Sequence, residues 1–98
     1  MDGKIDLRFE TKWRANNYNN LGLAYDYLRE TEKAKAAYVK ALDLNPSLDL
    51  VWFNLALLAA RPGDGVAFDL SVKQLKMLNK KLADSAIYLI ATQKFTNN

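Results

Sequence analysis

A pattern of large and small residues returns after 34 positions, and this period constrains the fold more than any other feature of the sequence. The run from Tyr18 to Gly22, YNNLG, returns as the run from Trp52 to Ala56, WFNLA. A fixed period of this length is typical of stacked helical repeats, in which each unit is a helical hairpin. We therefore expect an all-α fold made of antiparallel helix pairs.

The first helix pair is expected within residues 15–48. One helical face is indicated by the spacing i, i+3, i+4 and i+7 of Tyr18, Leu21, Gly22 and Tyr25. Glycine costs about 1 kcal/mol relative to alanine inside a helix, so Gly22 predicts a close approach of the partner helix. The inner face of that partner helix is expected to hold Ala34, Ala37, Tyr38, Ala41 and Leu42. Asn45-Pro46 should end it, because proline disfavours helical geometry in the residue before it.

These residues resemble the marker positions of the tetratricopeptide repeat family. The resemblance is carried by Tyr18, Leu21, Gly22, Tyr25, Ala34, Tyr38, Ala41 and Pro46, and it extends more weakly over residues 14–94. It implies a tetratricopeptide-like α-α superhelix of stacked helix pairs. It also implies a function in protein recognition without naming the partner.

The rest of the chain follows the same frame with departures. We expect a single domain over residues 14–98, with repeat one at 15–48, repeat two at 49–82 and a capping helix at 83–94. Ser47 or Asp49 is expected to cap the first helix of repeat two. The bulky residues Phe68, Val72 and Leu75 replace the family's smaller types, so an atypically packed pair is expected there. Residues 1–13 are expected to form an irregular lead-in that lays Phe9 or Trp13 against the first pair.

Composition excludes several classes of function. The chain has no histidine and no cysteine, so imidazole bases, thiol nucleophiles, disulfides and cysteine-ligated zinc sites are absent. We expect no catalytic residues, no enzyme activity, no metal and no cofactor. The net charge is +3, and the lysines fall on the second helices as a solvated face, so no nucleic-acid partner is expected. No apolar run approaches membrane length and the first four residues lack a signal-peptide pattern, which favours a cytoplasmic protein without a membrane span.

The resemblance implies that the first helices of successive repeats line a concave groove for a peptide or a partner helix. The positions of this sequence that would face it are Asn16, Asn19, Asn20, Leu23 and Tyr27 in repeat one, and Leu50, Phe53, Asn54, Leu57 and Arg61 in repeat two. Asn20 and Asn54 share a register, and an amide can bond a peptide backbone bidentately. The alternative is that these amides bond neighbouring helix groups.

Leu50, Phe53 and Leu57 form a possible apolar strip on the helix of repeat two. Exposed strips of this kind usually mark an interface, but the capping helix or the lead-in would bury the strip equally well. The leading hypothesis is a non-catalytic protein–protein interaction module. The alternatives are an assembly element that forms a homodimer, and an accessory part of a larger multi-repeat protein.

Overall fold

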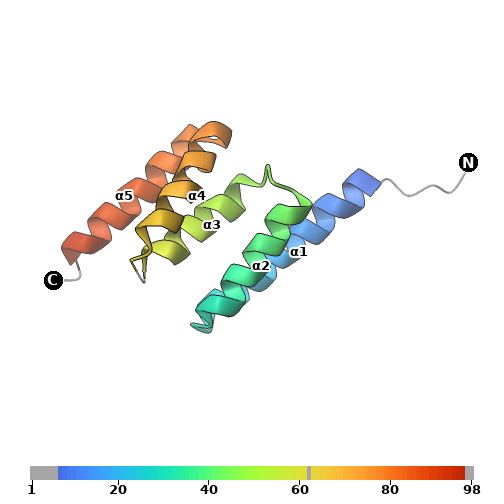
Figure 1. Ribbon diagram of the computed structural model, residues 1–98, viewed down its shortest axis with the longest axis horizontal. Coiled ribbons are helices and arrows are strands. Elements are labelled where there is room, and N and C mark those ends of the chain that lie inside the picture. Colours follow the sequence, from blue (N-terminus) through green and yellow to red (C-terminus); the bar gives the residue numbers. More distant parts are fainter. Residues whose placement is uncertain (1–6, 62, 97–98) are drawn as a thin grey trace, which may run out of the picture. The chain divides into compact units, whose positions relative to one another are not determined.

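The computed structural model describes the backbone of residues 7–61 and 63–96 and the side chains of residues 10–61 and 63–92. Within these ranges it contains five helices, α1 (Leu7–Tyr27), α2 (Thr31–Leu44), α3 (Asp49–Ala60), α4 (Gly65–Leu78) and α5 (Lys80–Thr96) (Figure 1). The described residues include no strand, and the all-α prediction is confirmed. The chain divides into two compact units, Met1–Leu48 and Asp49–Asn98, and the boundary between them coincides with the boundary expected between repeat one and repeat two.

Unit 1 is the antiparallel hairpin of α1 and α2 (Figure 1). Its core contains the fully buried Tyr38 and the buried residues Ala15, Ala34, Ala37, Ala41 and Leu42. A methyl group on Gly22 would lie only 2.5 Å from Cε1 of Tyr38. The predicted close approach at Gly22 is therefore made by the Tyr38 ring, which packs inside unit 1. Leu21, which was expected on the packing face, is exposed within this unit.

The beginning of α1 differs from the expected irregular lead-in. The helix starts at Leu7, so residues 7–13 continue it by almost two turns. The Trp13 side chain is 59% exposed, so it is not buried against the hairpin as one of the two expected arrangements would require. The side chain of Phe9 and residues 1–6 lie outside the described part of the chain.

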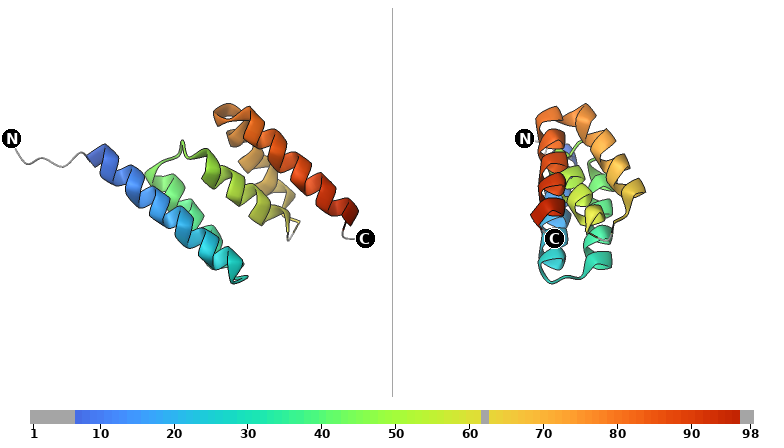
Figure 2. Two further views of the ribbon diagram at one scale, coloured as in Figure 1. Left: turned by 180° about the vertical axis from the view of Figure 1, so that it is seen from behind. Right: turned by 90° about the vertical axis from the view of Figure 1, so that its left-hand side faces the viewer.

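Unit 2 contains α3, α4 and α5, and α5 contacts both of the other helices (Figure 2). Its buried residues include Val51, Ala56, Leu58 and Val72, and a cluster of Leu75, Ala83 and Ala86 connects α4 with α5. Trp52, Phe53 and Leu82 pack against this cluster. The closing helix runs from Lys80 to Thr96, longer than the predicted 83–94, because it begins directly after α4 with only Asn79 between them.

The turn inside each hairpin has the same hydrogen bonds, shifted by one period. Arg29 and Gly63 share a register, and both have positive φ, 63° and 80°. The amide of Arg29 bonds to the Asp26 carbonyl and that of Gly63 to the Ala60 carbonyl, while the following amides bond to Tyr25 and Ala59. This pairing is the Schellman arrangement that ends helices at a left-handed residue. The repeat frame therefore continues through unit 2 despite its bulkier core.

The ends of α2 and α4 also correspond, and then the two regions diverge. The amide of Asn45 bonds to the Ala41 carbonyl, and that of Asn79 bonds to the Leu75 carbonyl. Asn79 also caps α5 by accepting from the Leu82 amide, and its Nδ2 donates to Asp49 Oδ2 at 3.0 Å.

The expected cap of α3 differs from the structure. Asp49 is the first residue inside α3, so the position before the helix is held by Leu48 and not by Ser47 or Asp49. The amide of Ser47 donates to Asn45 Oδ1, which places Ser47 in the turn between α2 and α3.

Candidate protein-binding surface

Four of the predicted binding residues form one exposed stripe along α1. Asn16, Asn20, Leu23 and Tyr27 follow the spacing i, i+4, i+7 and i+11, which places them within an arc of about 60° on a helix. All four are exposed, and Tyr27 at the end of the helix is 87% exposed. The helix geometry thus brings together most of the site that was predicted for repeat one.

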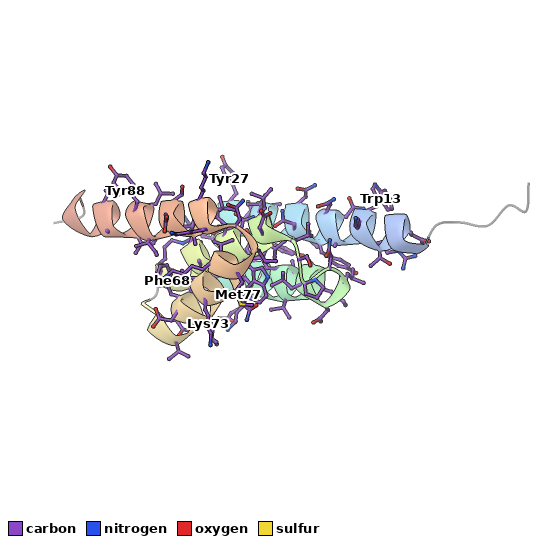
Figure 3. The ribbon with its side chains drawn as sticks, turned by 90° about the horizontal axis from the view of Figure 1, so that it is seen from above. Trp13, Tyr27, Phe68, Lys73, Met77 and Tyr88 are labelled. Carbon is purple, nitrogen blue, oxygen red and sulfur yellow. The ribbon has the colours of Figure 1, made fainter. Side chains whose placement is uncertain are left out.

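Trp13 extends this stripe, and the sequence analysis did not assign it to the site. It lies seven residues before Asn20 and fourteen before Tyr27, close to a whole number of helical turns in each case. Figure 3 shows Trp13 and Tyr27 projecting from the same side of unit 1. The seven-residue spacing was visible in the sequence, but α1 was expected to begin only after Trp13. We call Trp13, Asn16, Asn20, Leu23 and Tyr27 the α1 stripe.

Asn19 and Phe53 share a register and do not lie on the exposed stripes. Asn19 is buried, with 9% of its surface accessible, although it was expected to face the groove. Phe53 is half-buried and packs against the cluster of Leu75, Ala83 and Ala86. In each unit this position is rotated by about 100° from the asparagine that follows it, Asn20 or Asn54.

The predicted residues of α3 are only partly accessible. Leu50 and Arg61 are exposed, whereas Asn54 and Leu57 are half-buried. Asn54 and Arg61 each already interact within the chain. The structure covers the Leu50, Phe53 and Leu57 strip only in part, because Phe53 packs against the cluster that α4 and α5 form, whereas Leu50 is exposed.

The α1 stripe is uncharged and chemically suited to recognition. Among the described residues, the amides of Asn16 and Asn20 make no hydrogen bond within the chain, so their donors and acceptors face solvent. Nearby charges are already engaged, as in the Arg14–Glu10 ion pair at 2.7 Å. In the described part of the chain no three histidine, cysteine, aspartate or glutamate residues gather into a possible metal site.

Comparison with protein families identifies the first hairpin. The model of the tetratricopeptide repeat matches residues 15–48, which span most of α1, all of α2 and the turn that follows. This segment is a tetratricopeptide repeat. The resemblance expected from the sequence is thereby confirmed, and tetratricopeptide repeats generally mediate protein–protein interactions. Comparisons with curated proteins and with solved structures gave no match.

The tetratricopeptide frame explains the position of the α1 stripe. Gly22, which contacts the Tyr38 ring of α2, lies on the opposite side of the repeat's first helix. None of the described helices is both long and apolar enough to cross a lipid bilayer.

Proposed function

We propose that this chain is a non-catalytic protein-interaction module. The α1 stripe is its principal binding surface. It forms one wall of the concave groove in which the family holds a peptide or a partner helix. The observation that carries the proposal is the stripe itself. Two exposed aromatic rings lie near its ends, and between them lie two asparagine amides that have no hydrogen-bond partner among the described residues.

The composition of the stripe divides recognition into two tasks. Asn16 and Asn20 can each pair with a peptide N–H and C=O, which supplies affinity for a backbone regardless of its side chains. Trp13 and Tyr27 offer large rigid surfaces of the kind that dominate the energy of many interfaces. Partner side chains that pack on these two rings would therefore set the specificity.

The length of the stripe limits the size of the bound segment. Trp13 and Tyr27 are 14 residues apart, which corresponds to about 21 Å along a helix. An extended peptide of about six residues spans this distance, since each residue advances by about 3.3 Å. Because the stripe has no charged side chain, we propose that an internal, largely uncharged segment binds here, in preference to a terminal carboxylate.

A selection of short peptides displayed on phage, using the immobilised protein as target, tests this proposal. Enriched peptides would be synthesised and their affinities measured by calorimetry. Asn20→Ala and Tyr27→Ala should each weaken binding about tenfold or more, which corresponds to about 1.4 kcal/mol.

Tyr88 on α5 provides the matched control, because it is also an exposed tyrosine and lies outside the stripe. Tyr88→Ala should leave affinity unchanged, and circular dichroism should show that all variants keep their helices. Selected peptides that bind wild type, Asn20→Ala and Tyr27→Ala equally well would refute the assignment of the α1 stripe.

A further inference from the structure

The outer face of α4 carries an apolar stripe that no other part of unit 2 covers. Val66, Leu70 and Met77 are 74%, 57% and 76% exposed. Their spacing of four and seven residues confines them to an arc of about 40° along the helix. Lys73 lies about 20° outside this arc, and in Figure 3 it projects from the outer edge of α4. We call these four residues the α4 face.

The equivalent positions of α2 in the first hairpin provide a comparison, because they form a solvent-exposed helix face in the same protein. One period earlier, α2 has Glu32, Ala36 and Asp43 where α4 has Val66, Leu70 and Met77. All three α2 residues are exposed, and two of them are acidic. The α4 face is therefore a departure from the chain's own pattern, and exposed apolar stripes of this kind usually mark an interface.

The charges beside the α4 face indicate what covers it. Asp69 and Lys76 are exposed and seven residues apart, so they lie on the same flank of the helix. Among the described residues, neither side chain forms an ion pair. When a helix pairs with an antiparallel copy of itself about a two-fold axis, residues on one flank meet residues of the same flank. Asp69 then lies beside Lys76 of the copy, and the reverse contact forms by symmetry.

We propose that the α4 face is a self-association surface, on which α4 of a second copy of this chain packs in antiparallel orientation. The two-fold axis passes between Leu70 and Lys73, so Val66 meets Met77 of the copy and Leu70 packs on the stem of its Lys73. Two symmetric Asp69–Lys76 contacts flank the apolar centre. The interface is isologous, as in most homodimers.

The assembly is expected to be weak and separate from peptide recognition. One helix face buries much less than the roughly 800 Å² per partner of a standard stable interface, so we expect a dissociation constant on the order of 100 µM. The α4 face belongs to unit 2, whereas the α1 stripe belongs to unit 1. Substitutions on α4 should therefore leave affinity for a selected peptide unchanged.

Sedimentation velocity between about 10 µM and 1 mM tests the association. The wild-type average mass should rise from 11.1 kDa toward that of a dimer. Leu70→Glu should weaken association at least tenfold, whereas Ala36→Glu, the same charge at the equivalent exposed site of α2, should not. A wild type that stays monomeric at 1 mM, or a dimer that Leu70→Glu leaves intact, would overturn the proposal.

A charge swap tests which flanks meet. Asp69→Lys and Lys76→Asp should each weaken association, and the double variant should recover most of the lost affinity. Glu32→Lys on α2 changes the charge by the same amount as Asp69→Lys and should have little effect. A double variant that associates as weakly as Asp69→Lys alone would refute the flank contact.

Disulfide trapping tests the orientation, because the natural sequence has no cysteine to interfere. In the proposed dimer, residue 73 of one chain lies about 4.5 Å along the helix axis from residue 73 of the other chain. Residue 77 lies about 16 Å from residue 77 of the other chain, which is beyond the reach of a disulfide. Lys73→Cys should therefore oxidise readily to a crosslinked dimer. Met77→Cys should crosslink with Val66→Cys in a mixture but poorly with itself. Efficient crosslinking of Met77→Cys alone would indicate a parallel pair and overturn the antiparallel arrangement.

Discussion

In unit 1 a glycine on α1 lies against a buried tyrosine ring of α2, whereas the same positions of α3 and α4 hold Ala56 and Val72. Both hairpins keep the same turn hydrogen bonds one period apart. Unit 1 places its core volume in one aromatic side chain, while unit 2 distributes it over aliphatic residues that also contact α5. The 34-residue spacing of the backbone therefore depends on the hydrogen bonds that end the helices. The sizes of the side chains between the paired helices can change while this spacing is kept.

The largest expected difference between the units is the cost of truncating the residue at the centre of each core. Tyr38 is fully buried, so Tyr38→Ala should destabilise unit 1 by about 3–5 kcal/mol. Val72→Ala removes two methyl groups and should cost unit 2 about 2 kcal/mol. Native-state hydrogen exchange of the α2 and α4 amides measures both effects. Equal losses would show that the two cores are organised alike.

The Gly22–Tyr38 contact can be converted into its unit 2 counterpart. Gly22→Ala alone should destabilise by about 1–3 kcal/mol through overpacking against the buried ring, despite alanine's better helix propensity. With Tyr38→Val present, the added methyl group has room, so the same substitution should become neutral or stabilising. Urea denaturation of the four proteins in this double-mutant cycle gives the coupling energy. Additive effects would contradict the ring contact as the reason for the glycine.

The smallest effect is predicted for exchanging the turn residues between the two units. Unit 1 places an arginine at the left-handed position, where unit 2 has Gly63, which has no Cβ to strain. Asp64 also caps α4 by accepting from the Ala67 amide at 3.1 Å, whereas Glu30 makes no side-chain cap bond. Arg29→Gly with Glu30→Asp should therefore stabilise unit 1 by about 1–2 kcal/mol.

Thermal unfolding followed by circular dichroism measures this gain, and the reverse exchange in unit 2, Gly63→Arg with Asp64→Glu, should lower the midpoint. The ion pair between Glu30 and Lys33 is exposed and contributes little, so its loss should not mask the gain. A lower midpoint for the unit 1 variant would contradict the assigned roles of these turn residues.

The 34-residue period was enough to predict the helix pairs, because it combines side-chain size with helical spacing. It also located the end of α2, since Asn45-Pro46 leaves no other choice. The predicted start of α1 was wrong because residues 7–13 lack the marker pattern, although they contain no glycine or proline that would oppose a helix. The beginning of α5 depends on Asn79, whose side chain bonds both Leu82 and Asp49. The second of these contacts joins residues far apart in the chain, and local patterns do not reveal it.

The exposed stripe of α1 was predictable because i, i+4, i+7 and i+11 share a side of any helix. The spacing of four residues between Asn19 and Leu23 favours a shared helix face, so the low exposure of Asn19 could not be derived from the helical angle alone. The covering of Phe53 could not be derived from the sequence, since it depends on where α5 packs. Trp13 was missed for a different reason: its place on the stripe follows only once α1 is known to begin before it.

The hydrogen bonds that close each hairpin turn are satisfied by residues of that hairpin alone. A gene encoding such a chain can therefore grow by duplicating the segment for residues 15–48, because every new copy brings its own terminating turn. Each added copy would extend the surface by one hairpin, and the hydrogen bonds that end the existing helices would keep their partners. Arg29 and Gly63 show that two different residue types can meet the same backbone requirement at equivalent positions of the two hairpins.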